Sequence, residues 1–125
     1  QELARAALPP TDTFALRYRN SVYRSLAEER FRVEDDHLSL VELGADELAV
    51  LEEYYTAVGA ERGGPDASRT WSLAVHRPPI ALPLRVQATA LGERTLLTST
   101  REIALWRLVA GRDDTLVILT VEEAG

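Results

Sequence analysis

The stretch FALRYRNSVYRSLAEERFRV, residues 14–33, decides the fold because two of its segments alternate between apolar and polar side chains. The first segment, residues 14–19, has a large apolar or aromatic side chain at every second position. The second, residues 27–33, places Phe31 and Val33 in the same pattern. Because a period of two is typical of a strand with one buried face, we predict two half-buried strands joined by a polar connection.

Further strands are predicted on both sides of a glycine-rich loop at 61–68. The pair Asp35-Asp36 indicates a turn, after which HLSLVEL, residues 37–43, alternates again. The strands predicted beyond the loop are 70–76, 81–91 and 115–121. Pro83 places the start of the second of these at an edge or a bulge. The last one is nearly all apolar and β-branched, so we expect it to be buried on both faces.

Two segments carry helical features. ADELAVLEEYYTAV, residues 45–58, has apolar residues at the spacing of a helix. In STREIALWRLVAG, residues 99–111, Ser99 and Glu102 have the spacing of a capping box, and Gly111 follows the last turn. We therefore predict a short helix that ends before this glycine. The residues expected on its buried stripe are Ile103, Trp106 and Ala110.

About six strands with one or two short helices predict a mainly β fold, either a small β-sandwich or an open barrel, with an α+β arrangement as the alternative. Residues 1–13 are rich in alanine and are interrupted by Pro9-Pro10, which indicates an N-terminal arm. Residues 14–125 are expected to form a single β-rich domain, since this length is enough for one core.

The composition bears on several classes of function. A net charge of -6 makes nucleic acids and anionic membranes poor partners, so we predict no nucleic-acid binding. No apolar run approaches the ~20 residues that span a bilayer, and we predict no membrane insertion. Cysteine is absent, which excludes disulfides, thiolate metal sites and cysteine nucleophiles. Methionine is absent too, and we expect a processed, exported form or a trimmed chain.

The polar connection between the first two strands holds the main candidate site. If Tyr18 faces the core, the same phase aims Asn20 at the core. Glu29 likewise has the phase of Phe31. A buried carboxylate without a partner costs several kcal/mol or takes up a proton. We therefore expect Glu29 to be satisfied by the Asn20 amide, by the Ser21 hydroxyl or by an arginine, in a structural network or at a ligand-contacting site.

Several residues here match a motif that runs aromatic-x-Tyr-x-His-Ser-Val and continues to a Glu and an aromatic. The matching residues are Phe14, Tyr18, Ser21, Val22, Glu29 and Phe31. Gly59-Ala60 matches the start of a second motif, Gly-Ala-Gly-Leu-Pro, and the ending ALPLRV to TLVILTV is similar as well. On these residues the chain, over most of 14–122, resembles the bacterial family called domain of unknown function 1850. The resemblance implies extended structure at 45–58, where local spacing favours a helix.

Members of that family are usually exported and are often encoded beside TRAP-type solute transporters. The resemblance thus implies an extracytoplasmic location and a transporter component as a protein partner, but no reaction, since the family has no established one. Asn20 stands where the family pattern has His. An imidazole beside a carboxylate can move protons or bind a metal, whereas an amide does neither well. We therefore predict hydrogen bonding, rather than acid–base or metal chemistry, at this connection.

The remaining polar groupings favour structural roles. The adjacent aspartates at 35–36, next to His37, and at 113–114 are typical of solvated turns rather than metal sites. GAERGG, residues 59–64, lacks the Walker spacing and a lysine, so we expect a surface loop, with a lid or docking loop as the alternative.

Two pairs of adjacent acids, Glu28-Glu29 and Glu52-Glu53, resemble glycosidase carboxylates only superficially. Neighbouring residues of a strand point to opposite faces, so neither pair is expected to form a catalytic dyad. One member of each pair should then lie in solvent. His76 ends a predicted strand, and we expect it at the surface or at an edge.

The predicted ligand- or partner-binding residues are Tyr18, Asn20, Ser21 and Glu29. The leading hypothesis is a non-enzymatic extracytoplasmic accessory or partner-binding domain associated with solute transport, with no cofactor and no metal. One alternative is a small-ligand binder that uses the mouth of a β-barrel near Tyr18, Asn20 and Glu29. A second alternative is a small hydrolase or isomerase in which Glu29 and His76 converge.

Overall fold

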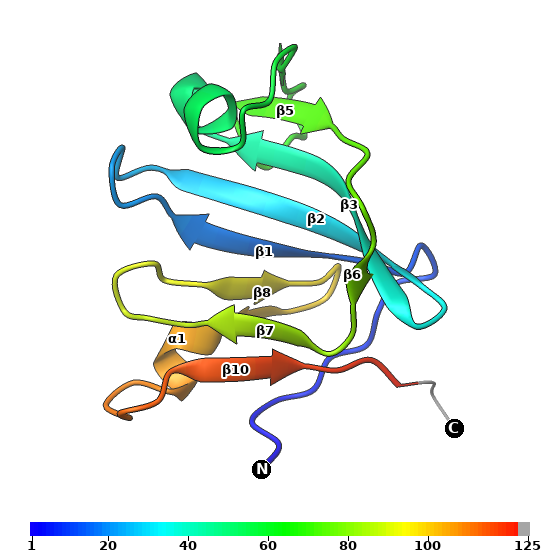
Figure 1. Ribbon diagram of the computed structural model, residues 1–125, viewed down its shortest axis with the longest axis vertical. Helices are drawn as coiled ribbons and strands as arrows, with labels where there is room; N and C mark the ends of the chain where they lie inside the picture. The colour runs from blue at the N-terminus through cyan, green and yellow to red at the C-terminus, as the bar shows by residue number, and fades with distance from the viewer. Residues whose placement is uncertain (123–125) are drawn as a thin grey trace.

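The computed structural model describes residues 1–122 and shows a mainly β fold, which confirms the predicted fold class (Figure 1). Within these residues there are ten strands, several of them only two to four residues long. The strands are β1 Thr13–Arg19, β2 Leu26–Glu34, β3 His37–Ala45, β4 Glu61–Arg62, β5 Trp71–Ala74, β6 Ile80–Ala81, β7 Leu84–Gln87, β8 Thr95–Leu97, β9 Glu102–Ala104 and β10 Leu116–Leu119. The helical elements are the π-helical turn η1, Val50–Tyr54, and the α-helix α1, Leu105–Leu108.

Eight strands form one open antiparallel sheet in the order β4-β5-β3-β2-β1-β8-β9, with β6 paired to β3. β7 and β10 form a separate two-stranded antiparallel sheet. The pair predicted from residues 14–33 lies at the centre of the large sheet. Phe14 is paired with Phe31, and their ring centroids are 5.4 Å apart. The alternation in this stretch therefore places one continuous apolar face at the middle of the molecule.

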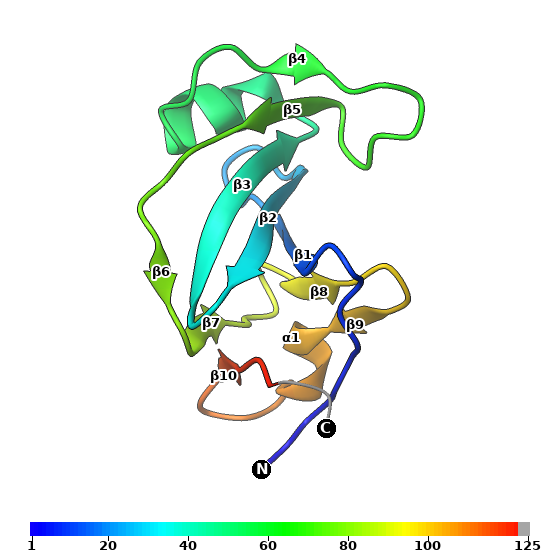
Figure 2. The same cartoon turned by 90° about the vertical axis from the view of Figure 1, so that its right-hand side faces the viewer.

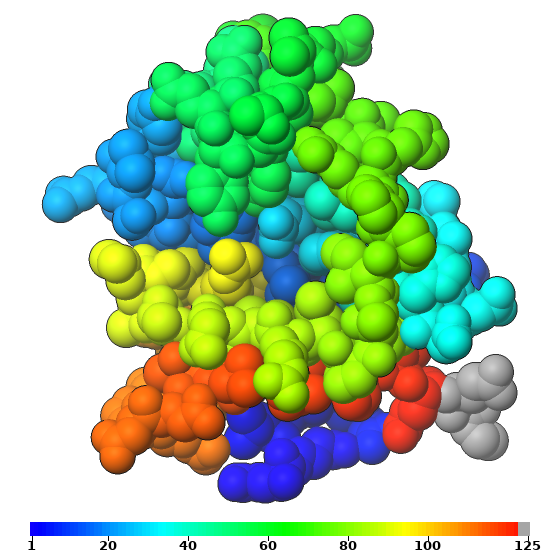
Figure 3. Space-filling model, in the orientation of Figure 1, coloured from blue at the N-terminus to red at the C-terminus, as the bar shows by residue number. Residues whose placement is uncertain are grey.

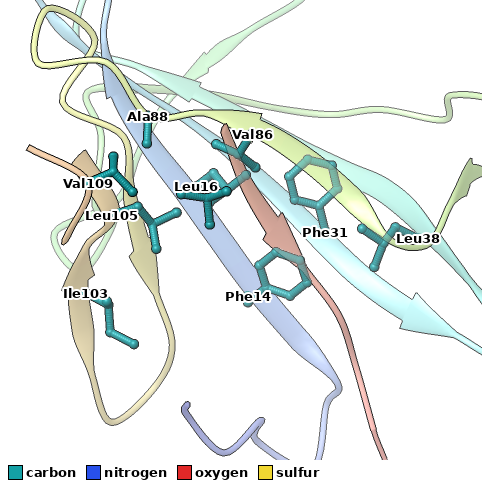
Figure 4. Close-up of a cluster of buried hydrophobic side chains, with 10 residues drawn as sticks. Phe14, Leu16, Phe31, Leu38, Val86, Ala88, Ile103, Leu105 and Val109 are labelled. Atoms are coloured by element: carbon teal, nitrogen blue, oxygen red, sulfur yellow. The ribbon is translucent and has the colours of Figure 1, made fainter. Parts of the chain in front are cut away.

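That apolar face is covered in two places by two different elements. Phe14 and Leu16 of β1 belong to the main core, together with Val86 of β7 and Val117 of β10 (Figure 4). Tyr18, two residues further along, belongs to a second core under η1. Its members are Tyr18, Ala27, Leu43, Ala45, Val50, Leu51 and Ala57. Figure 2 shows η1 and β7 on the same side of the large sheet.

The segment 45–58, for which local spacing and the resemblance disagreed, contains one helical turn. β3 continues to Ala45, and η1 then occupies Val50–Tyr54. Leu51 is fully buried against the large sheet, which explains why the apolar spacing of this segment is helical. The chain leaves the turn through Thr56, whose φ is 50°.

The helix predicted over 99–110 is wrong in its first half, where β8 and β9 form a hairpin. The hydroxyl of Thr98 accepts a hydrogen bond from the backbone N–H of Arg101 at 3.0 Å, which closes the turn between the strands. The capping-box spacing of Ser99 and Glu102 therefore falls in a hairpin and caps no helix. Local side-chain bonds of this kind compete with helix formation.

The predicted helical stripe changes with this correction. Ile103 is buried, but as a strand residue paired with Leu96. Trp106 lies in α1 and packs partly against the main core, whereas Ala110 is exposed. The β-branched Ile103 gains more from cross-strand packing than from a single helical turn, so tertiary packing overrides the local pattern.

The last strand also differs from its prediction. β10 was expected to be buried on both faces, but Val117 is buried while the next residue, Ile118, is 45% exposed. The reason is that β10 pairs only with β7, and this small sheet lies against the large sheet with one face. Pro83 lies between β6 and β7, outside both strands. This fits the prediction that Pro83 places the start of the segment 81–91 at an edge or a bulge.

The first twelve residues contain no strand or helix, and β1 begins at Thr13. Leu3, Ala6 and Leu8 of this arm pack against the main core. None of the helices within residues 1–122 has the length and apolar character needed to cross a membrane.

Candidate functional site

The part of the large sheet between η1 and β7 forms the floor of a cleft of about 480 Å³. η1 lies along one side of this cleft, and β7 with the loop that follows it forms the other. Figure 3 shows the hollow between the green atoms of η1 and the yellow-green atoms of β7. A volume of this size is within the range of small-molecule sites. The floor residues are Leu16, Tyr18, Glu29 and Phe31, and the walls contain Tyr54, Arg19, Asn20, Ser21, Leu84, Arg85, Val86, Gln87, Thr89, Leu91, Gly92 and Arg94.

Glu29 is half-buried in the floor and is the end of a short series of hydrogen bonds. One carboxylate oxygen accepts a hydrogen bond of 2.9 Å from the Tyr55 hydroxyl. The Tyr55 oxygen lies 2.6 Å from the hydroxyl of Tyr18. Because Tyr55 has a single hydroxyl proton and directs it at Glu29, Tyr18 is the donor in the second bond. The series is therefore oriented from Tyr18 through Tyr55 to the carboxylate.

Arg94 holds the same carboxylate from the cleft side. Its guanidinium nitrogen Nη1 lies 3.6 Å from the other carboxylate oxygen of Glu29. The guanidinium carbon also lies 4.5 Å from the centroid of the Tyr18 ring, in cation–π geometry. Both partners of the ion pair are largely screened from solvent, with side chains 25% and 21% exposed. Glu29 is thus satisfied by a tyrosine and an arginine.

The two tyrosines of this series stay protonated far above neutral pH. Burial raises the pKa of Tyr18 to about 12. Burial, followed by the negative charge of Glu29, raises the pKa of Tyr55 as well. Both hydroxyls therefore act as hydrogen-bond donors at neutral pH and do not act as bases.

Asn20 is buried, as the strand phase predicts, but the expected bond between Asn20 and Glu29 is wrong. The side-chain oxygen of Asn20 accepts hydrogen bonds from the backbone N–H groups of Val22 and Tyr23, each at 3.0 Å. The reason is that β1 ends one residue earlier, so Asn20 begins a turn and no longer follows the strand. Ser21 is exposed at the rim of the cleft.

The structure therefore brings two of the four predicted site residues, Tyr18 and Glu29, into the cleft floor, and the other two into its wall. Sequence reasoning missed Tyr55, and it named an arginine among the possible partners of Glu29 without identifying Arg94. They reach the floor from η1 and from the loop before β8, so no periodic pattern connects them with β1 or β2. The adjacent aromatic pair Tyr54-Tyr55 was the available signal, since an unusual aromatic pair often marks a site or a core.

The cleft is positively charged, although the whole chain carries a net charge of -6. Three arginines line it, Arg19, Arg85 and Arg94, against the single carboxylate of Glu29. Within residues 1–122, neither Arg19 nor Arg85 forms an ion pair, and both are exposed. Two residues that line the cleft therefore carry guanidinium groups with no ion-pair partner among the described residues.

Glu28 lies on the opposite face of β2 from Glu29, as the alternation predicts, but it is not in solvent. Its side chain is 6% exposed, beneath the loop between β4 and β5. Ser68 donates a hydrogen bond of 2.8 Å to Glu28, and the Arg69 nitrogen Nε lies 3.2 Å from it. Arg69 also pairs with Asp46 at 2.8 Å. The expectation that one member of this acidic pair is solvated is wrong because a distant loop covers the second face.

That loop closes tightly on itself at Gly63. A Cβ atom at this position would lie 2.4 Å from the Ala67 side chain, closer than any packed side chain allows. Gly63 therefore permits the tight closure of the loop that covers Glu28.

His76 follows β5, is exposed, and does not line the cleft. Within the described residues, no hydrogen bond or ion pair joins it to Glu29. His37 is the first residue of β3, directly after the turn, 3.6 Å from Glu34 and 3.7 Å from Asp36. Residues 1–122 contain no cluster of three or more His, Asp or Glu side chains arranged to hold a metal ion.

Comparisons of the chain with protein-family models, with curated proteins and with solved structures find no match. The resemblance to domain of unknown function 1850, with the export and the transporter partner that it implies, stays a prediction.

Proposed function

We propose that this domain binds small organic anions, carboxylates with an apolar part, in the cleft between η1 and β7, and that it binds them without a catalytic step. The observation that supports this proposal most strongly is the pair of unpaired arginines, Arg19 and Arg85, at the cleft of an acidic protein. A guanidinium group recognises a carboxylate through two parallel hydrogen bonds. A positive cleft in a negative surface also concentrates anions.

Apolar side chains beside these arginines favour a ligand that is more than a bare anion. Leu91 is 72% exposed and Tyr54 is 62% exposed, on opposite sides of the cleft. Leu84 and Val86 of β7 add apolar surface to the same wall. Such surface at a concave site is typical of ligand binding, since it gains free energy when a ligand covers it.

The floor is built to hold its shape. The Tyr55 hydrogen bond and the Arg94 ion pair fix the Glu29 carboxylate from two sides. A site whose side chains are already ordered loses little conformational entropy when the ligand binds. The same contacts occupy both oxygens of Glu29, which favours a structural role for this carboxylate over a role as a general base.

A thermal unfolding assay with hexanoate tests the proposal, with hexylamine and hexanol as ligands of the same size. We expect stabilisation by hexanoate alone, approaching ~2.7 kcal/mol at about 100 times its dissociation constant. The double variant Arg19→Gln/Arg85→Gln should lose this stabilisation. The matched control Arg32→Gln/Arg112→Gln removes the same charge from exposed positions outside the cleft and should keep it. Equal stabilisation in both variants, or none by hexanoate, contradicts the proposal.

The place of this domain in the cell is a separate proposal that rests on the family resemblance carried by residues such as Tyr18, Ser21 and Glu29. We propose an extracytoplasmic protein that serves a solute transporter. Fractionation of cells that express the full-length gene tests it. Recovery of the protein outside the cytoplasm is the expected result, and recovery in the cytoplasm contradicts it.

A further inference from the structure

One wall of the cleft is a strand with a free edge. β7 pairs with β10 along one edge only, and within residues 1–122 no strand pairs with its other edge (Figure 1). All four residues of β7 line the cleft. Because successive side chains of a strand point to opposite faces, four successive lining residues mean that the edge itself faces the cleft.

The pairing with β10 shows which backbone groups the free edge presents. The N–H of Ala88 donates to the carbonyl of Thr115 at 3.0 Å, in the register that pairs Val86 with Val117. In an antiparallel ladder the hydrogen-bonded positions alternate, so Val86 also faces β10. The N–H and C=O groups of Arg85 and Gln87 therefore point to the free edge. Unpaired groups of this kind are a template for another strand.

The side chains next to this edge define what a paired strand would carry. Arg85 and Gln87 are exposed, whereas Leu84 and Val86 lie over the apolar floor. Residues directly opposite each other in paired strands share a face. A strand added to β7 would thus place the side chains opposite Arg85 beside a guanidinium, and the intervening side chains on the floor formed by Leu16 and Phe31.

We infer that the ligand of this cleft is an extended polypeptide segment in which acidic residues alternate with apolar ones, and that it adds as an antiparallel strand to the free edge of β7. This inference rests on the proposed function, because it assigns the anion of that proposal to acidic side chains of a peptide. Antiparallel pairing matches every strand pair among the described residues. Backbone hydrogen bonds supply affinity in this mode, and the alternating side chains supply specificity.

The capped pentapeptide acetyl-Leu-Glu-Leu-Glu-Leu-amide is the probe, and calorimetric titration gives its dissociation constant. We expect it to bind at least about tenfold more tightly than hexanoate, since it adds two or more backbone hydrogen bonds. N-methylation of both Glu residues removes the N–H groups that face β7 and should weaken binding by about tenfold. N-methylation of the second and third Leu residues, whose N–H groups point away from β7, should have little effect.

A variant of the protein tests the same edge. Gln87→Pro removes the N–H that faces the cleft and leaves the bonds between β7 and β10 in place, because proline is tolerated at an edge. Gln87→Ala keeps this N–H and is the matched control. We expect Gln87→Pro to weaken binding of the pentapeptide by about fivefold relative to Gln87→Ala.

The outcomes separate this inference from the proposed function. If hexanoate binds but the pentapeptide does not, or if both N-methylated peptides bind as the parent does, the strand-pairing inference is overturned and anion binding stands. If neither hexanoate nor the peptide binds, the proposed function falls and the inference falls with it. Selective loss through the Glu N-methyl groups and through Gln87→Pro supports the inference.

Discussion

At the scale of the residue, Glu29 shows how a carboxylate is accommodated on the apolar face of a sheet. Its neighbours on that face are Leu16 and Phe31, which offer no hydrogen bonds. Tyr55 and Arg94 replace the water that the carboxylate loses, one at each oxygen. A carboxylate satisfied in this way avoids the cost of a buried polar group without a partner.

Tyr55→Phe tests the hydrogen-bond series. The substitution leaves the Tyr18 hydroxyl without its acceptor and takes a donor from Glu29, so we expect the free energy of unfolding to fall by about 1–3 kcal/mol. Urea denaturation measures this change. Tyr54→Phe is the control, because the Tyr54 hydroxyl forms no hydrogen bond within residues 1–122, and its effect should stay within about 0.5 kcal/mol. Equal effects of the two substitutions contradict this arrangement.

The same tyrosines make stability depend on alkaline pH. The pKa of Tyr18 rises from 10.0 to about 12 on folding, so the folded state holds this proton more tightly than the unfolded state. The corresponding stabilisation is fully present below about pH 10 and is lost as the pH rises towards about 12. We expect wild-type protein to lose more stability over this interval than Tyr18→Phe. Parallel pH profiles of the two proteins rule out this origin.

Glu28 supports a different prediction, on the opposite face of the sheet. Glu28→Gln removes the charge that Arg69 faces at 3.2 Å in a buried pair, and we expect a loss of about 1–3 kcal/mol of unfolding free energy. Glu42→Gln removes a charge from the exposed pair with Arg30 at 3.9 Å and should cost less than about 1 kcal/mol. Chemical denaturation compares the two variants, and a larger loss in Glu42→Gln would show that the loop does not bury Glu28.

At the scale of the element, the hairpin of β8 and β9 is where local sequence and tertiary packing disagree. Ile103→Ala tests the strand. Because Ile103 is 6% exposed in the main core, we expect a loss of about 2–4 kcal/mol. Ile118→Ala, at the 45% exposed position of β10, should cost about 1 kcal/mol or less. A small effect at Ile103 would contradict its burial in the main core.

The elements that could be predicted are those whose pattern is set by one buried face. β1, β2 and β3 follow the alternation of their sequences because each lies in the middle of the large sheet. The capping-box spacing near Ser99 misled because the Thr98 side chain closes a turn there instead. Likewise, the apolar run of β10 does not reveal that only one face is covered, since that depends on pairing with β7, far away in the sequence.

The candidate site, too, could be predicted only where the pattern of a strand determines the position of a side chain. The strand phase correctly placed Tyr18 and Glu29 on one face, and Asn20 in a buried position. It failed to find the partners of Glu29, because Tyr55 and Arg94 arrive from separate elements and carry no local pattern. The partners of a buried charge come from the tertiary arrangement, which one sequence does not encode in its periodicity.

At the scale of the whole molecule, the cleft results from covering one sheet face with two unconnected elements. The main core fills the space under β7 and β10, and the second core fills the space under η1. The gap between them remains concave and is lined by three arginines. A fold that is acidic overall thus presents one positive hollow, which is the basis of the proposed anion binding.

An NMR titration of ¹⁵N-labelled protein with hexanoate tests this account most directly. We expect saturable shifts of backbone amide signals at the cleft, above all at Tyr18, Gln87 and Arg94, with the amides of the 63–70 loop unchanged. Shifts that do not saturate, or that gather away from the cleft, would contradict it.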